Sequence, residues 1–118
     1  MDGRAIQRTV RQSPRKMRLV VDLIRGKDVN EAYAILGFSK KRAAKQIAKT
    51  LRSAVSNAEQ KALRSNEPFD VDELRIIKAI VNEGPPLKRW QAAAQGRATP
   101  IRKRTSHVEI AVAEKENA

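Results

Sequence analysis

The sequence predicts an α+β fold, because a helical pattern dominates its first half and strand patterns dominate its second half. Up to about residue 63, apolar residues recur three and four positions apart, as on one face of an amphipathic helix. After residue 72 this period disappears, and residues 74–81 and 108–113, which are dense in Ile and Val, are predicted to be strands. The chain has 118 residues, so we expect a single domain over residues 1–118.

The first helix is predicted to begin at Ser13-Pro14, after a candidate third strand at residues 6–10. Ser13 is a favoured N-cap residue, and a proline at the first helical position loses no hydrogen bond, because that N–H has no partner within a helix. Gly26 stands where a left-handed C-cap belongs. The apolar stripe between these two ends comprises Met17, Val20, Val21 and Ile24.

A second stripe on the same helix is charged and consists of Arg15, Arg18, Asp22 and Arg25. Residues three and four positions apart are neighbours on a helix surface. The simplest interpretation is therefore a solvated face on which Asp22 pairs with both Arg18 and Arg25.

Two more helices are predicted before a polar loop at residues 65–72. One opens at Val29-Asn30 and closes at Gly37, and Ser39 is expected to cap the next, which runs from about Lys40 to Leu63. One face of this last helix carries the basic stripe Lys41, Lys45, Lys49 and Arg52. A basic amphipathic helix can lie on an anionic membrane, but that normally requires Trp, Phe or Leu at the surface. This helix offers mostly Ala with Ile, Leu and Val, so the membrane interpretation is disfavoured.

Residues 84–104 are interpreted as an extended β-hairpin arm within the domain. Gly84-Pro85-Pro86 opens the segment, and core-forming side chains are nearly absent from it. If the flanking strands continue into it, a ribbon from Leu74 to a tip near Ala93 is about 65 Å long at about 3.3 Å per residue. The radius of gyration of a 100-residue domain is only ~13 Å. An isolated two-stranded ribbon is marginal in water, so we expect something outside the protein to hold it.

The charge of the chain predicts a polyanionic partner. Lys and Arg number 25 against 13 Asp and Glu, which gives a net charge of +12, and the sequence pI is about 10.8. The cations concentrate in residues 4–27, 40–64 and 88–104, and no acidic residue lies between positions 83 and 109. This is the electrostatic footprint of a nucleic-acid binder. RNA is favoured over DNA, because no helix-turn-helix recognition helix stands out and an extended basic ribbon suits irregular RNA.

Enzymatic and metal chemistry find little support in the sequence. The chain has no Cys and one His, so it offers no disulfide, no Cys-based zinc site and no thiol nucleophile. No phosphate-cradling GxGxxG or Walker motif occurs, and we expect no cofactor and no small-molecule substrate. Asp70, Asp72 and Glu73 could be imagined as a metal site or as part of a basic nuclease, but a turn leading into a strand is the simpler interpretation. Ser106 and His107 are adjacent on a strand and point to opposite faces, which disfavours a catalytic dyad.

No feature of the sequence predicts a membrane partner or an export signal. No apolar run approaches the ~18 residues of a membrane span. Asp2, Arg4 and Arg8 stand where a signal peptide would be apolar. We expect the chain to stay in the compartment where it is made and to be mature from residue 1.

Two blocks of motifs resemble one known family. The first block runs from Arg11 to Lys27 and contains Ser-Pro-Arg-Lys-Met-Arg and Asp-Leu-Ile-Arg-Gly-Lys. The second contains, in order, Asn82-Glu83-Gly84-Pro85, Lys88-Arg89, Gln95-Gly96-Arg97-Ala98 and Ile101-Arg102-Lys103-Arg104-Thr105-Ser106-His107-Val108. In their order and spacing, over about residues 5 to 113, these motifs resemble the large-ribosomal-subunit protein family numbered twenty-two.

The resemblance implies three helices packed on a small three-stranded antiparallel sheet, with a long protruding β-hairpin. It also implies a structural constituent of the large ribosomal subunit that binds large-subunit ribosomal RNA (rRNA) and supports its assembly. The hairpin is expected to line the nascent-peptide exit tunnel. The implied partners are rRNA, neighbouring ribosomal proteins and the nascent polypeptide, in a cytoplasmic or an organellar ribosome. The competing interpretation is a DNA-architectural or RNA-annealing protein that works alone.

Candidate site residues follow from this resemblance together with the basic segments. Those assigned to rRNA are Arg8, Arg11, Arg15, Lys16, Arg18, Arg25, Lys27, Lys88, Arg89, Trp90, Arg97, Arg102, Lys103, Arg104, Ser106 and His107. Those assigned to the tunnel wall are Lys88, Arg89, Trp90, Gln91, Ala92, Ala93 and Ala94. Trp90 is interpreted as stacking on RNA, because no core exists so far out on the arm. Where the family commonly has Pro-Arg-Ala near the tip, this chain has Ala92-Ala93-Ala94, so Lys88, Arg89 and Arg97 are the better candidates for tip contacts.

Overall fold

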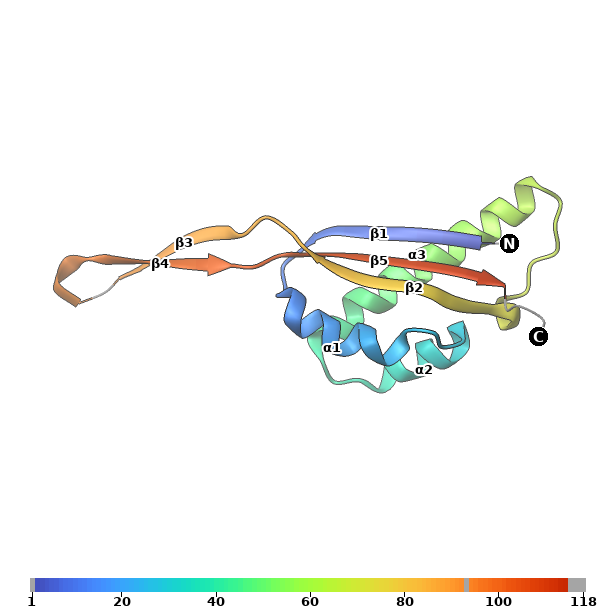
Figure 1. The fold of residues 1–118 in the computed structure, drawn as a ribbon, viewed down its shortest axis with the longest axis horizontal. Coiled ribbons are helices and arrows are strands. Elements are labelled where there is room, and N and C mark those ends of the chain that lie inside the picture. Colours follow the sequence, from blue (N-terminus) through green and yellow to red (C-terminus); the bar gives the residue numbers. More distant parts are fainter. Residues whose placement is uncertain (1, 93, 115–118) are drawn as a thin grey trace.

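Three helices pack against an antiparallel sheet, and a two-stranded ribbon leaves this body at the end away from the chain termini (Figure 1). The structure is a computed structural model that describes residues 2–92 and 94–114. Its helices are α1 (Pro14–Ile24), α2 (Val29–Phe38) and α3 (Arg42–Arg64). Its strands are β1 (Asp2–Val10), β2 (Leu74–Glu83), β3 (Leu87–Ala92), β4 (Ala98–Lys103) and β5 (Ser106–Glu114). Single 3₁₀ turns are η1 (Val71–Glu73) and η2 (Ala94–Gly96).

The sheet of the body has the order β1-β5-β2, with both pairings antiparallel. Central strand β5 follows the predicted alternation, because Val108, Ile110 and Val112 are fully buried in the core. Across the strands, Ile110 pairs with Ala5 on β1 and with Ala79 on β2. The sheet therefore presents one apolar face to the helices.

Helix α1 forms as its sequence predicts. The Ser13 hydroxyl accepts a hydrogen bond from the Lys16 backbone N–H at 3.4 Å, and Pro14 is the first helical residue. Gly26 adopts a φ of +77°, the left-handed conformation that ends many helices. The predicted apolar stripe, Met17, Val20, Val21 and Ile24, is completely buried.

The predicted junction between α2 and α3 is wrong in two respects. Gly37 does not close α2, which continues through Phe38, because a glycine inside a helix costs only about 1 kcal/mol and does not force an end. Ser39 does not cap α3, whose N-cap is Lys41. The Ser39 hydroxyl instead accepts a hydrogen bond from the Lys41 N–H at 3.3 Å and stabilises the turn between the helices.

The expectation that the flanking strands run straight into the hairpin is also wrong. Strands β3 and β4 form a separate two-stranded sheet, so the described residues form five strands in two sheets. The last pair of the body is Glu83 with Ser106, and the first pair of the hairpin is Leu87 with Lys103. One side of the ribbon therefore has one residue more than the other, and two prolines on that side lack the N–H needed for a continuous ladder.

The hairpin makes the molecule strongly elongated. Its longest dimension is 67 Å and its radius of gyration is 17.8 Å, well above the ~13 Å of a compact domain of this size. None of the helices described is long and apolar enough to span a membrane.

Candidate nucleic-acid interface

A strongly basic groove lies where the hairpin joins the body. Its volume is about 850 Å³, and seven of its lining residues are cations: Arg11, Lys16, Lys41, Arg42, Arg102, Lys103 and Arg104. Neither Asp nor Glu occurs in this lining within the described part of the chain. Gln12, Ser13, Leu19 and Ala43 complete the wall. Such a concave surface of one sign attracts polyanions.

Four separate segments supply the cations of this groove. Arg11 follows β1, Lys16 lies on the first turns of α1, and Lys41 and Arg42 begin α3, while the remaining three end the hairpin. Helix α3 has no acidic residue in its first turn and no side-chain cap on its N-terminal N–H groups. The positive end of the helix dipole therefore adds to the charge of the groove.

The groove wall also contains an unsatisfied hydrogen-bond acceptor. The side-chain oxygen of Gln12 is buried and has no hydrogen-bond partner among the residues described. Buried polar atoms normally have a partner. Because this oxygen is buried, a ligand in the groove would reach it only if the Gln12 side chain moved.

Five of the seven groove cations were among the predicted rRNA-binding residues, whereas Lys41 and Arg42 were not. The available signal was the run Lys40-Lys41-Arg42 between two helices. In the sequence Lys41 belongs to the basic stripe of the predicted helix, and nothing local indicates that the start of this helix lies beside the hairpin. The structure places both beside the end of β4, more than 50 residues away in sequence.

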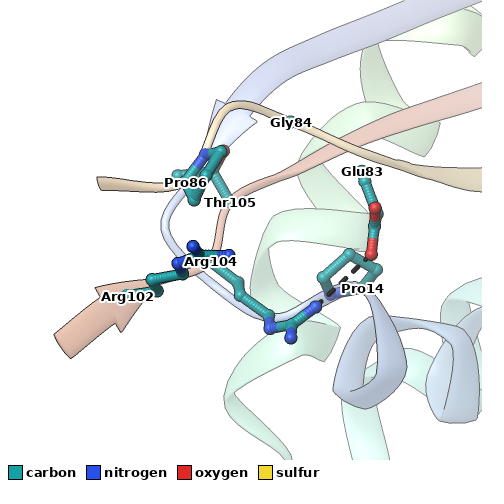
Figure 2. A pocket seen from close by; sticks show the side chains of 7 residues that line it. All are labelled: Pro14, Glu83, Gly84, Pro86, Arg102, Arg104 and Thr105. Carbon is teal, nitrogen blue, oxygen red and sulfur yellow. Dashed lines mark hydrogen bonds and ion pairs between the residues drawn. The ribbon is translucent and has the colours of Figure 1, made fainter. Parts of the chain in front are cut away.

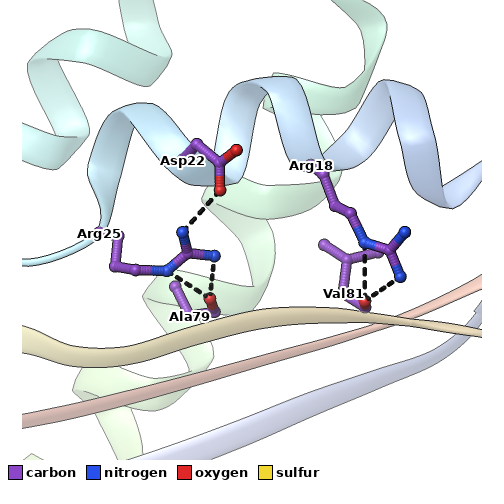
Figure 3. Close-up of polar contacts among 5 residues, drawn as sticks. All are labelled: Arg18, Asp22, Arg25, Ala79 and Val81. Atoms are coloured by element: carbon purple, nitrogen blue, oxygen red, sulfur yellow. Dashed lines mark hydrogen bonds and ion pairs between the residues drawn. The ribbon is translucent and has the colours of Figure 1, made fainter.

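Arg18 and Arg25 have a different environment from the predicted solvated face (Figure 3). Arg25 pairs with Asp22 at 2.6 Å, as expected, and its Nε and Nη2 also donate to the Ala79 carbonyl oxygen at 3.1 and 2.8 Å. Arg18 does not pair with Asp22 and donates to the Val81 carbonyl oxygen. These two guanidinium groups attach α1 to the edge strand of the sheet.

The neck of the hairpin is held by contacts between its two strands (Figure 2). The Gly84 N–H donates to the Thr105 carbonyl at 2.9 Å, and the Thr105 hydroxyl donates to the Pro85 carbonyl at 2.7 Å. A Cβ at Gly84 would collide with the Thr105 hydroxyl. Arg104 forms an ion pair with Glu83 at 3.5 Å beside a small pocket of about 150 Å³. The base of the arm is thus built from fixed backbone contacts and one exposed ion pair.

Ser106 and His107 each have a partner inside the fold. Ser106 is fully buried, and its hydroxyl donates to the Gln12 carbonyl at 2.6 Å. His107 Nδ1 accepts a hydrogen bond from the Thr9 N–H at 2.9 Å, where Thr9 has a φ of +55°. The two side chains have separate partners: His107 connects β5 to the end of β1, and Ser106 connects it to the turn after β1.

The outer hairpin exposes its side chains. Trp90 faces Pro100 across the ribbon and is 70% exposed. The other described residues of the predicted tip and arm are exposed as well: Lys88, Arg89, Gln91, Ala92, Ala94 and Arg97. Ala93, which was predicted to line the tunnel, lies outside the described residues. The Arg89 guanidinium donates to the Lys88 carbonyl at 2.8 Å.

The other predicted cations lie on the surface of the body. Arg8 on β1, Arg15 on α1 and Lys27 after α1 are all exposed. The Lys27 carbonyl accepts a hydrogen bond from the Ile76 N–H at 2.9 Å, so its backbone pairs with the start of β2.

The acidic cluster at residues 70–73 forms the predicted turn into a strand. The Asp70 carboxylate accepts a hydrogen bond from the Asp72 N–H at 2.9 Å and caps η1, which leads directly into β2. The Asp72 carboxylate accepts a hydrogen bond from the Asn30 side chain. These contacts give the carboxylates a structural role at the far end of the body.

Away from the groove, carboxylates neutralise part of the positive charge. Glu109, in the middle of β5, accepts hydrogen bonds from Arg4 on β1 and, at 3.3 Å, from Lys78 on β2. Burial alone would raise the pKa of Glu109, but these two hydrogen bonds outweigh it and hold the pKa below the usual glutamate value. Asp2 receives a hydrogen bond from Lys61 at 2.7 Å, which lowers the pKa of Asp2. Among the seven groove cations, Arg104 alone has an ion pair with a described residue, Glu83 at 3.5 Å, so the groove keeps most of its positive charge.

The family model of ribosomal protein L22p/L17e matches residues 5–113 of the chain. This chain belongs to that family. The match covers all three helices and the whole hairpin, so it includes every segment that lines the basic groove. It is a family of ribosomal proteins rather than of enzymes, and the resemblance of the sequence motifs is confirmed.

Relatives of this L22p/L17e family are similar over their full length. A large ribosomal subunit protein uL22 of Bifidobacterium longum (strain DJO10A) is 52% identical over 118 residues, which are 100% of this chain and 99% of the relative. The large ribosomal subunit protein uL22 of Clostridium novyi (strain NT) is 52% identical over 115 residues, 98% of this chain and 99% of the relative. Body and hairpin are therefore both shared with these proteins.

Proposed function

We propose that the chain is a structural protein of the large ribosomal subunit that grips rRNA with the groove at the hairpin base. The observation that carries this proposal is the groove of about 850 Å³ with seven cations and no acidic residue in its described lining. Phosphodiester backbones carry one charge per nucleotide, and contacts to them dominate the affinity of nucleic-acid binders. Membership of a ribosomal family supports rRNA as the polyanion.

RNA suits this groove better than DNA for two reasons. The cations come from a helix start, a turn and an extended hairpin, an irregular surface of the kind that matches folded RNA. The exposed Trp90 on β3 adds an aromatic surface on which an unpaired base would stack.

We further propose that the hairpin reaches the wall of the nascent-peptide exit tunnel. It extends the molecule to a longest dimension of 67 Å, and its described tip offers the small or neutral side chains Gln91, Ala92, Ala94 and Gln95. Small neutral groups suit a surface past which varied polypeptides slide. In this proposal the body anchors the protein, and Lys88, Arg89 and Arg97 attach the arm to rRNA.

The test is a binding titration against large-subunit rRNA over a salt series, together with cosedimentation. Each neutralised phosphate contributes about 0.7–0.9 to the slope of log K against log salt, so several groove cations predict a slope steeper than about −3. The protein should also remain on large subunits through a high-salt wash. A shallower slope, equal affinity for duplex DNA of the same length, or release in the wash would contradict the proposal.

A further inference from the structure

Phe38 is an exposed aromatic residue that the fold leaves without a core partner. It is the last residue of α2 and is 90% exposed, the highest value among the large apolar side chains described. The buried stripe of this helix consists of Val29, Ala32 and Leu36. A helix turns about 100° per residue, so Phe38 lies about 200° beyond Leu36, on the outward side. No rotation of its side chain brings it to the core.

On the outward side of α2, the exposed residues after Glu31 are small or apolar. Ala34, Gly37 and Phe38 are all exposed, while the opposite side is buried in the core. Glu31 lies seven positions before Phe38, on the same side of the helix. A single exposed aliphatic residue needs no explanation, but an exposed aromatic ring on such a helix offers a stacking surface.

The charges around Phe38 favour a nucleic acid as the partner. The exposed run Lys40-Lys41-Arg42 follows it, and no acidic residue occurs between positions 32 and 58. Lys41 and Arg42 line the basic groove. Three steps of at most 3.8 Å between Cα atoms keep Phe38 within about 11 Å of Lys41. The Ser39 hydroxyl, which accepts the Lys41 N–H at 3.3 Å, fixes the turn between them.

We propose that Phe38 stacks on an unpaired rRNA base whose neighbouring phosphates lie on Lys41 and Arg42. This inference rests on the proposed function of the groove. It adds a contact that forms only where an unpaired base is turned out of its stack. Proteins that bind single-stranded nucleic acid combine aromatic rings with adjacent cations, because a base stacks on the ring and the phosphates of the backbone pair with the cations.

The test compares the affinities of four proteins for protein-free large-subunit rRNA from Bifidobacterium longum over a salt series. They are the wild type, Phe38→Ala, Phe38→Tyr and the control Leu63→Ala, which truncates another exposed apolar side chain, 68% exposed, at the other end of α3. Base stacking predicts that Phe38→Ala weakens binding about 5- to 150-fold. The salt slope stays unchanged because no charge is lost. Phe38→Tyr and Leu63→Ala should bind like the wild type.

The outcomes separate this inference from the proposed function. If the rRNA affinity of the wild type depends steeply on salt and Phe38→Ala binds equally well, the stacking contact is wrong, while the proposed function of the groove still stands. Equal losses in Phe38→Ala and Phe38→Tyr would also overturn it, since tyrosine preserves the ring. If the wild type itself shows no salt-dependent binding, the proposed function fails first. A photo-reactive phenylalanine analogue at position 38 should crosslink to rRNA in assembled subunits, and crosslinks to protein alone would refute the stacking.

Discussion

Arg18 on α1 donates two hydrogen bonds to one acceptor, the carbonyl oxygen of Val81 on β2, at 3.2 Å from Nε and 2.9 Å from Nη2. Arg25 repeats the arrangement two helical turns later on the Ala79 carbonyl. Strand β2 is an edge of the sheet, and the Lys27 carbonyl pairs with its Ile76 N–H. Open strand edges invite pairing with other chains. Helix α1 and the turn after it therefore shield this edge.

Replacing Arg18 by Ala should destabilise the fold by about 1–3 kcal/mol, because the Val81 carbonyl loses two hydrogen bonds from a charged group. Urea denaturation of the free protein measures the change. Arg15→Ala is the matched control, since Arg15 is exposed on the same helix, and it should stay within about 0.5 kcal/mol of the wild type. Equal stability of the two variants would show that the edge contact does not support the fold.

Limited trypsin digestion of the free protein should cut first in the hairpin, at Lys88, Arg89, Arg97 or residues 102–104. The two-stranded sheet has no hydrophobic core of its own, and its basic residues are exposed. Such regions open at low free-energy cost. Mass spectrometry identifies the earliest fragments, and bound rRNA should delay these cuts. A first cut within α3 would contradict the prediction.

Glu109 should make the stability of the body depend on pH. Its pKa is lowered in the folded chain, so its ionised form favours folding, and this contribution is complete above the usual glutamate pKa. The contribution disappears as the pH falls through the folded pKa. Glu109→Gln should therefore be less stable than the wild type at neutral pH, and the difference should shrink in acid. A difference in denaturation midpoint that is independent of pH would argue against the bridge to Arg4 and Lys78.

Shortening the hairpin by two facing pairs should separate anchoring in the subunit from the role proposed for the hairpin in the exit tunnel. Removing Gln91, Ala92, Ala98 and Thr99 takes about 6.6 Å from the reach of the arm and keeps the remaining side chains on their faces. The variant should still enter large subunits but should change the response to arrest peptides or tunnel-bound drugs. The double substitution Arg102→Ala with Lys103→Ala is the contrast, because it weakens the groove and should reduce incorporation. The opposite pattern would reverse the proposed roles.

Local signals predicted those parts of the fold whose causes lie within a few residues. Ser13, Pro14 and Gly26 set both ends of α1, and the alternation after His107 fixed the buried face of β5. The junction after α2 was missed, since Gly37 and Ser39 permit a helix end without requiring one.

Contacts between distant segments could not be predicted from the sequence. The partners of Arg18 and Arg25 are backbone carbonyls more than 50 residues away, and a carbonyl has no signature in the sequence. The groove combines the start of α3 with the end of β4. The sequence shows each of its cations but not that they lie close together in space. The roles of Lys41 and Arg42 depend on this convergence, so the sequence does not predict them.

The placement of the single tryptophan on the exposed arm makes the two parts of the molecule optically distinct. No aromatic residue is among the fully buried side chains described, and Trp90 lies 70% exposed on β3. The fluorescence of Trp90 therefore responds to binding at the hairpin and changes little when the body unfolds. Unfolding of the body is followed separately by the far-ultraviolet circular dichroism of its helices. An unlabelled sample thus carries one reporter for docking and another for folding, and the two signals can be recorded in the same titration.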